Sequence, residues 1–196
     1  HRSKKMSKLF RILMSIFVAV FYVACSDDGW KSFEIEGAIE DVQKTFPDGR
    51  HQVSYFFKED TGEKVAEVEF HPNGQPKIHK HFEQNALNGE SWCYYEDGKT
   101  WSLNNFKDGA YHGVYKTWYP NGQLHQLGNY LNGKKTGEWI TYYANGGVDT
   151  QGYYLDDRKA GVWTSFNQQG VKMREQNFVA DADSPTPVNS GRCPVT

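Results

Sequence analysis

The residues best suited to metal chemistry are three histidines, His71, His79 and His81. His79 and His81 are two residues apart, so on a β-strand their side chains point to the same face. A zinc site needs about four ligands, but the nearest carboxylate is Glu83, no cysteine stands at ligand spacing, and Lys80 adds positive charge. The sequence therefore predicts solvated strand histidines, with no metal site and no cofactor.

Two pairs of adjacent carboxylates are the candidates for general acid–base catalysis, Glu59-Asp60 and Asp156-Asp157. Such catalysis needs two groups that face a cleft with separated pKa values, and both pairs stand in turn-like segments. The sequence also lacks a phosphate-binding glycine loop, a Gly-x-Ser-x-Gly elbow and a His-Glu-x-x-His pair. We therefore predict no catalytic residues and a protein that is not an enzyme.

Composition narrows the possible partners. The 196-residue chain has a formal net charge of -2, and its charges alternate in sign without a basic cluster. Nucleic-acid binding relies on clustered Lys and Arg, so we expect no nucleic-acid partner. The hydrophobic fraction is 38%, yet 15% of residues are aromatic and 19 are glycine. Few aliphatic and many aromatic residues favour short strands and tight turns over a thick aliphatic core.

The N-terminal segment has the pattern of an export signal. Ile12 to Ala24 is an almost wholly apolar run that follows Lys8 and Arg11, and it is too short to span a bilayer. The run ends in Tyr22-Val23-Ala24-Cys25, which resembles the lipobox of bacterial lipoproteins, although Tyr22 departs from the usual aliphatic residue. The resemblance implies cleavage before Cys25, lipidation of Cys25, and export to the outer membrane with the lipid as the only membrane contact. An uncleaved apolar anchor is the alternative.

The strongest signal is a repeat of 24 residues. Short turns end in glycines whose successive spacings are 25, 24, 24, 24 and 24, at Gly49, Gly74, Gly98, Gly122, Gly146 and Gly170. Asn or Asp precedes all but the last of these glycines, and Asn-Gly and Asp-Gly favour type I′ hairpin turns. A fixed period of this size indicates an array of repeated units.

Aromatic residues follow the same period. Eight residues after each turn glycine stands an aromatic: Phe57, Phe82, Phe106, Tyr130, Tyr154 and Phe178. Four residues before it, every repeat after the first has another aromatic: Phe70, Tyr94, Trp118, Tyr142 and Phe166. Each unit is thus a strand, a tight turn, a strand and a polar loop. A lone hairpin is barely stable in water, so neighbouring repeats must bury each other's rings.

These patterns predict an all-β fold, an elongated up-and-down antiparallel sheet of about six hairpins and about twelve strands. We assign residues 1–24 to upstream residues and signal peptide, 25–45 to an N-terminal tether or cap, 46–180 to the array and 181–196 to a disordered tail. Equivalent rings should stack along the sheet, with Trp139 beside Trp163 and Tyr130 beside Tyr154. The sequence leaves open which face is buried.

The best-defined unit, Gly-Glu-Trp-Ile-Thr-Tyr-Tyr-Ala-Asn-Gly at residues 137–146, resembles the bacterial variant of the MORN repeat. Residues 113–178 match it well, 89–106 fairly, and 46–82 only at turn and aromatic positions. The resemblance implies elongated β-sheets that contact proteins or lipids and have no chemistry of their own. Many members are described as antitoxin-like, which implies toxin neutralisation as a further possibility.

Cys93 could be a reactive thiol or the disulfide partner of Cys193. The equivalent position in later repeats holds Thr117, Thr141 or Ser165, so we favour a small buried side chain with a structural role.

The aromatic residues are the remaining candidates for binding. Tyr and Trp anchor many protein interfaces, and sugars stack on aromatic faces. We therefore name Trp118, Trp139, Tyr143 and Trp163 as candidate binding residues, while noting that the same rings could form the thin core of the array. The predicted function is a lipid-anchored surface protein that binds a protein partner, with polysaccharide binding as the alternative.

Overall fold

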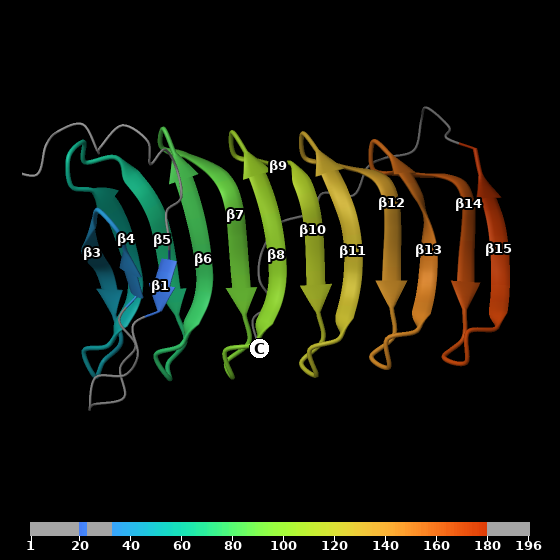
Figure 1. Cartoon of the computed structure of the whole chain (residues 1–196), viewed down its shortest axis with the longest axis horizontal. Helices are drawn as coiled ribbons and strands as arrows, with labels where there is room; N and C mark the ends of the chain where they lie inside the picture. The colour runs from blue at the N-terminus through green and yellow to red at the C-terminus, as the bar shows by residue number, and fades with distance from the viewer. Residues whose placement is uncertain (1–19, 23–32, 180–196) are drawn as a thin grey trace, which may run out of the picture.

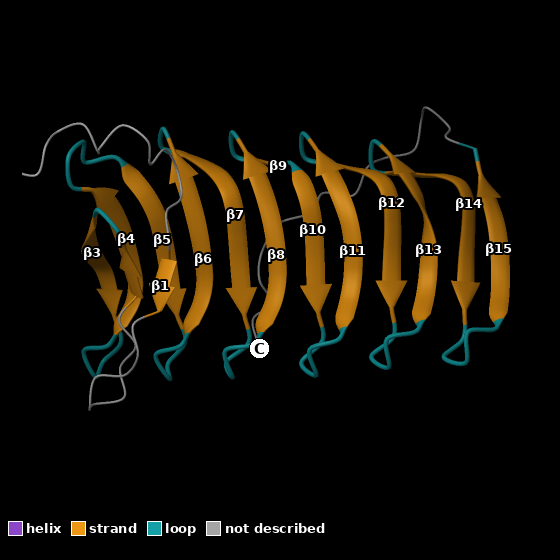
Figure 2. Cartoon of the chain, viewed as in Figure 1, coloured by secondary structure: helices purple, strands orange, loops and turns teal. Residues whose placement is uncertain are grey.

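The computed structural model describes residues 20–22 and 33–179. Every regular element in this part of the chain is a β-strand, and the strands stand side by side in one long open sheet (Figures 1 and 2). Neighbours in the sheet are antiparallel and follow the order of the chain. The predicted all-β, up-and-down array is confirmed. No described segment forms a helix that could cross a membrane.

Thirteen strands make up the main sheet, and two more form a small separate one. The small sheet pairs β1 (Val20–Tyr22) with β2 (Phe33–Ile35). The main sheet contains β3 (Ala38–Thr45), β4 (His51–Lys58), β5 (Lys64–Phe70), β6 (Pro76–Glu83), β7 (Ala86–Tyr94), β8 (Thr100–Lys107), β9 (Ala110–Tyr111), β10 (Gly113–Trp118), β11 (Leu124–Leu131), β12 (Lys134–Tyr142), β13 (Val148–Leu155), β14 (Arg158–Phe166) and β15 (Lys172–Phe178).

The six turn glycines each close one hairpin, from β3–β4 to β14–β15. Residues 38–45, which the sequence analysis assigned to a tether or cap, form β3, so the sheet begins before residue 46. The short β9 lies off the main path and pairs with β8. The 24-residue period therefore corresponds to two strands of sheet.

The prediction of type I′ turns at the Asn-Gly and Asp-Gly sites is wrong. At Asn145-Gly146 only the glycine has a positive φ, +86°, and its amide donates to the Tyr143 carbonyl at 2.9 Å. Tyr143 N–H in turn donates to the Gly147 carbonyl at 2.8 Å. This is a three-residue loop, a type I turn followed by a left-handed glycine. The Asn side chain stabilises it by accepting from Gly147 N–H at 3.0 Å.

Type I′ geometry occurs instead between the repeats. Asp156 and Asp157 have φ of 49° and 68°, and they join Leu155 to its paired residue Arg158. Two-residue loops with positive φ at both positions are type I′ turns. The same geometry recurs at Gln84-Asn85, Asp108-Gly109 and Asn132-Gly133. The adjacent carboxylates Asp156-Asp157 are therefore turn residues.

Strand pairing defines two faces. Tyr115, Trp139 and Trp163 lie on one, which we call the ladder face. Alternate residues lie on the other, which we call the reverse face. One continuous row of paired residues crosses the reverse face from β3 to β15: Val42, Ser54, Val68, His79, Trp92, Leu103, Lys116, Leu127, Ile140, Gln151, Thr164 and Glu175.

A buried apolar cluster lies in the N-terminal half of the reverse face. Phe56, Ala66, Val68 and Phe70, on β4 and β5, are buried in one cluster with Ile35 of β2. The small β1–β2 sheet is thus connected to the main sheet through Ile35. The C-terminal half of the sheet has no comparable buried apolar cluster among its described residues. Other contacts hold its strands together.

Candidate binding surfaces

Aromatic rings of successive repeats touch along the ladder face. The Trp139 ring centroid lies 5.4 Å from Tyr115, 5.2 Å from Tyr130 and 5.7 Å from Tyr154. Tyr154 then touches Trp163 at 5.0 Å. The Tyr115–Trp139 pair is tilted and the other three are edge-to-face, and aromatic pairs in such arrangements contribute about 0.5–1.5 kcal/mol each beyond their burial. The ladder therefore alternates Trp with Tyr and does not place Trp139 directly beside Trp163, as the equivalence of positions had suggested.

Two glycines make room for the tryptophans. Trp139 lies flat over Gly128 and Trp163 over Gly152, and a Cβ on either glycine would overlap the indole ring. Each indole N–H donates to a backbone carbonyl, Trp139 to Asn129 at 3.2 Å and Trp163 to Tyr153 at 3.0 Å. This glycine column was not among the features predicted from the sequence. Gly128 and Gly152 stand 24 residues apart in mid-strand, where glycine is unfavourable without a close approach of this kind.

Lysines cover the outer side of the same rings. Lys135 Nζ lies 4.3 Å from the Trp139 ring centroid and Lys159 Nζ lies 4.2 Å from that of Trp163. Ammonium groups at this distance are attracted by the ring face. Burial lowers the pKa of Lys135, and the positive charge of Lys159 lowers it further while Asp157 opposes the shift. The ladder is thus packed by residues of the chain on both sides.

Repeats are also joined at their turn ends by tyrosine hydroxyls. Tyr95 donates to the Trp118 carbonyl at 2.7 Å, and Tyr119 and Tyr143 make the equivalent bonds at 2.8 Å to Tyr142 and Phe166. The turn asparagines add a second bond to the following repeat, from Nδ2 of Asn73, Asn121 and Asn145 to a turn carbonyl. Asparagine suits this position because its oxygen closes its own turn while its nitrogen reaches the next.

The four predicted binding residues all take part in this packing. Trp139 is 5% exposed. The Tyr143 hydroxyl and the Trp118 carbonyl belong to the turn-end bonds, and both residues are half-buried. Trp163 is half-buried near the C-terminal end of the ladder. Their role in binding stays a prediction.

A shallow hollow lies beside Trp163. Aromatic and polar side chains line it together: Thr150, Lys159, Trp163, Thr164, Ser165, Arg174, Gln176 and Phe178. Ring faces next to hydrogen-bonding groups are the pattern on which sugars stack. The hollow therefore has a lining that suits a small polar ligand.

The C-terminal half of the reverse face carries exposed apolar side chains. Val114, Tyr153, Val162 and Met173 are 38%, 55%, 49% and 66% exposed. They occupy β10, β13, β14 and β15. These strands are stabilised by aromatic packing on the opposite face, the ladder face. Tyr153 adds an aromatic ring with a hydroxyl, a combination common in protein interfaces.

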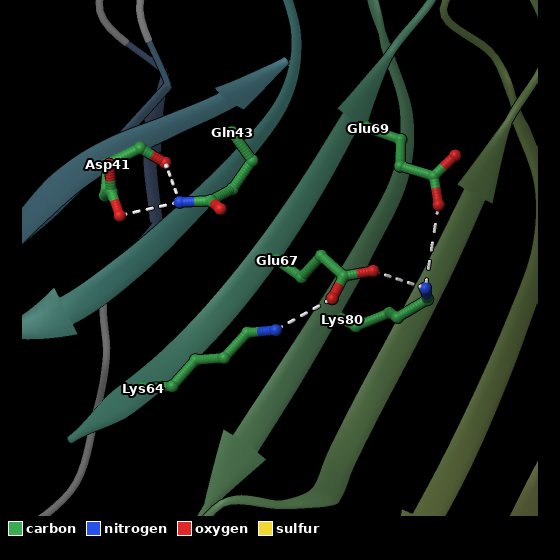
Figure 3. Close-up of polar contacts among 6 residues, drawn as sticks. All are labelled: Asp41, Gln43, Lys64, Glu67, Glu69 and Lys80. Carbon is green, nitrogen blue, oxygen red and sulfur yellow. Dashed lines mark hydrogen bonds and ion pairs between the residues drawn. The ribbon is translucent and has the colours of Figure 1, made fainter.

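In the N-terminal half of the sheet, the ladder face carries charged side chains in place of aromatic rings. Lys64 and Lys80 contact Glu67 at 2.8 and 2.7 Å, and Lys80 also approaches Glu69 at 3.7 Å (Figure 3). Figure 3 also shows Gln43 bonded to Asp41 at the neighbouring edge, at 2.6 Å. Burial alone would raise the pKa of Glu67, but the hydrogen bonds from both lysines lower it on balance. This network pairs its charges internally.

The prediction of solvated histidines is wrong. His79 is 3% exposed, and its ring lies 4.4 Å from that of His81. Burial, and to a lesser extent His81, lowers the pKa of His79 to about 3. His71 makes a different contact: its Nε2 bonds the Tyr94 carbonyl at 3.0 Å. Within the described residues, no group of three or more His, Cys, Asp or Glu side chains could hold a metal ion.

Cys93 is buried, as expected, and it is disulfide-bonded. The interpretation of Cys93 as an unpaired small side chain is therefore wrong. Its partner lies outside the described residues, as do Cys25 and Cys193, the other cysteines of the chain. The predicted lipidation site and the predicted disordered tail fall in the same undescribed parts.

Comparison with protein families agrees with this geometry. The pattern of the family described as "MORN repeat variant" matches twice, at residues 111–132 and 135–156. These two stretches of the chain thus match MORN repeats of the variant type. The matched residues include β10, β11, β13 and all of β12 except its first residue, and with them the packing of Trp139 over Gly128.

Other comparisons add little to the MORN assignment. Comparison with curated proteins gives no match. Among solved structures, the chain is similar to TarM, with 15% identity and a TM-score of 0.25 over 63% of this chain. A TarM mutant from S. aureus, in complex with fondaparinux, α-GlcNAc-glycerol and UDP, gives 15% identity and a TM-score of 0.26 over 64% of this chain. The chain spans 21% of the length of each of these structures.

Proposed function

We propose that this chain is a non-enzymatic, lipid-anchored protein of the bacterial outer membrane that binds another protein through the reverse face of its last three repeats. The observation that carries the proposal is the exposure of Val114, Tyr153, Val162 and Met173 on one flat side of the sheet. The rings of the ladder face are already packed by neighbouring repeats and lysines. The reverse face therefore offers exposed apolar side chains for a partner to cover.

Rigidity of the sheet supports this role. The ladder and the turn-end bonds fix β10 to β15 from the ladder side and at the turns, so a partner on the reverse face meets side chains held on a fixed backbone. Polar residues flank the apolar ones, with Gln151 and Thr164 in the adjacent row. Apolar centres with polar surroundings are typical of protein interfaces. An exported toxin is one candidate partner, because many proteins with the MORN variant repeat are described as antitoxin-like.

Export is supported by chemistry at two cysteines. Cys25 follows an apolar run and a small residue, as lipidation requires, and Cys93 is disulfide-bonded. Disulfides persist in oxidising compartments such as the periplasm and cell surface. Labelling with radioactive palmitate should mark the native chain but not Cys25→Ser, and protease treatment of whole cells should remove the labelled protein. Equal labelling of both proteins would contradict the anchor.

Binding is tested by site-specific photocrosslinking in intact cells. A photoreactive residue at Tyr153 should capture one protein reproducibly, and the double change Val114→Asp and Val162→Asp should abolish capture. Ile39 is similarly exposed, at 58% against 55% for Tyr153, but it lies in β3 at the opposite end of the sheet, so the same probe at Ile39 is the matched control. Capture at both positions, or at neither, would contradict a specific interface on the reverse face.

The hollow beside Trp163 favours polysaccharide binding as a second candidate. Trp163→Ala should then abolish binding on a glycan array, while Tyr153→Ala, on the opposite face, should leave binding intact. Unfolding curves would exclude the trivial explanation that Trp163→Ala disrupts the array. Absence of binding by the native chain would remove this candidate.

A further inference from the structure

The hollow beside Trp163 lies at the C-terminal end of the aromatic ladder. Two cations, Lys159 and Arg174, belong to its lining, and none of the eight described residues that line it is acidic. We propose that the hollow binds the carboxylate of an acidic sugar, one uronic acid residue of a polysaccharide. This inference rests on the second candidate function, polysaccharide binding, and is independent of the protein interface on the reverse face.

The ammonium group of Lys159 is held between two rings of the lining. Its Nζ lies 4.2 Å from the Trp163 ring centroid and 5.3 Å from that of Phe178. Because Trp163 lies flat over Gly152, Lys159 covers the ring face that points away from the sheet. Lys159 is nevertheless exposed, so a ligand that enters the hollow meets a positive charge whose side chain is already ordered. Less conformational entropy is then lost on binding.

Arg174 adds a second cation, at a position where the earlier repeats have none. Four residues after the turn glycine, these repeats have an uncharged residue: Val53, Ile78, Ser102, Gln126 and Thr150. In the described part of the chain, neither Arg174 nor Lys159 forms an ion pair. The neighbouring Glu175 is paired with Lys172 instead, at 2.9 Å. Both cations of the hollow are therefore available to an anion.

The preceding repeat has an equivalent lysine in a different setting. Lys135 stands 24 residues before Lys159 and lies over the Trp139 ring in the same way. Lys135 is half-buried, and its N–H donates to Asp157 Oδ1 at 2.8 Å, which brings a carboxylate beside it. An exposed pair of cations at the ladder is thus a property of the last repeat.

The remaining lining suits the hydroxyl groups of a sugar. Thr150, Ser165 and Gln176 lie around the hollow with the cations, and hydroxyl and amide side chains both donate and accept hydrogen bonds. The hollow has a volume of about 190 Å³, below the roughly 300–1,000 Å³ of pockets that enclose a drug-sized molecule. It therefore fits one sugar ring, with the rest of the chain outside.

Charge favours an acidic sugar over a neutral one. A neutral sugar that stacks on Trp163 must displace the Lys159 ammonium from the ring face, and so loses its attraction to the ring. A carboxylate leaves that contact in place and pairs with the ammonium. It also accepts two parallel hydrogen bonds from the Arg174 guanidinium. An acidic peptide offers the same carboxylate but lacks the ring hydroxyls that Thr150 and Ser165 can bond.

A matched glycan panel tests the ligand class. The full chain is applied to oligosaccharides that contain glucuronate, galacturonate or mannuronate, to the methyl ester of each, and to a glutamate-rich peptide. At least one uronate should bind about tenfold more tightly than its own ester, with an affinity that falls as salt is added. Equal binding of acid and ester would overturn the inference and leave polysaccharide binding standing. Equal binding of the peptide would overturn the sugar assignment, and no binding at all would remove the second candidate function as well.

Charge-removing variants test the location of the site. Lys159→Gln and Arg174→Gln should each weaken binding of the preferred uronate about threefold, and the double variant should bind it no better than the ester. Lys135→Gln removes the equivalent lysine of the preceding repeat and should leave the affinity unchanged. Both altered residues of the hollow are exposed, and urea unfolding verifies that each variant folds. Full affinity in the double variant, or an equal loss in Lys135→Gln, would refute a site in the hollow.

Discussion

The two halves of this sheet solve the same problem in different ways. In β4 and β5 the reverse face is apolar and packs with Ile35, whereas the ladder face there carries the network of Lys64, Glu67 and Lys80. From β10 onward the ladder face is aromatic and the reverse face is exposed. The comparison teaches that a repeat can be held together from either side, and that the side left unused becomes available for binding.

Truncation of a core ring should separate the halves most clearly. Phe56→Ala should lower the free energy of unfolding by about 3–5 kcal/mol, because Phe56 is 2% exposed and leaves a cavity under Ile35. Val162→Ala, on the same face of the C-terminal half, should cost less than about 0.5 kcal/mol. Urea unfolding of both variants measures the difference, and equal losses would erase the distinction.

Acid should weaken the N-terminal half first. The pKa of His79 falls to about 3 on folding from an ordinary 6.5, so the unfolded chain binds more protons between these values. Stability is then present above pH 6.5 and is lost as the pH falls toward 3, by at most about 1.4 kcal/mol per pH unit. His79→Leu should flatten this dependence, as urea midpoints from pH 7 to pH 4 would reveal. A parallel pH dependence in the variant would contradict the assignment.

The lowered pKa of Glu67 acts in a lower range. Its contribution is present above the ordinary carboxylate pKa of 4.5 and is lost as the pH falls below it. Glu67→Gln should therefore reduce acid sensitivity only below about pH 4.5, which distinguishes it from His79→Leu.

A methyl group at Gly128 should disturb the C-terminal half specifically. The added Cβ of Gly128→Ala overlaps the Trp139 indole, at a cost of about 1–3 kcal/mol. Combining it with Trp139→Leu should give a double variant less destabilised than the sum of the two single changes. Strict additivity in thermal unfolding would mean that the ring does not depend on the missing side chain.

Removal of one turn-end bond should have the smallest effect. Tyr119→Phe deletes the hydroxyl that reaches the Tyr142 carbonyl, with an expected loss of about 0.5–1.5 kcal/mol. Tyr153→Phe removes a hydroxyl from an exposed ring on the reverse face and should be neutral in the same denaturant assay. A loss at Tyr153 as large as at Tyr119 would contradict the role of the turn-end bonds.

The glycine and aromatic periods were enough to predict the hairpins, their number and the antiparallel order. The faces could not be predicted, because rings occur on both sides of each strand and burial depends on register shifts such as that between Leu127 and Asn129. The turn type at Asn145-Gly146 was missed because a left-handed glycine satisfies more than one loop geometry. The Gly128 column carried a 24-residue signal that could have been found.

Burial of His79 and pairing of Cys93 depend on segments distant in sequence. His79 lies beside Val68, eleven residues away, and the partner of Cys93 lies at least 68 residues from it by sequence. Local pattern contains no information about such contacts. The candidate binding residues were predicted from side-chain type alone. In the structure these residues pack against neighbouring repeats of the same sheet.

The strands run crosswise to the length of the molecule (Figure 1). Tension between an anchored N-terminus and a captured partner would therefore pull neighbouring strands apart, loading their hydrogen bonds one ladder at a time. Such a sheet yields hairpin by hairpin and lengthens in increments of about two dozen residues.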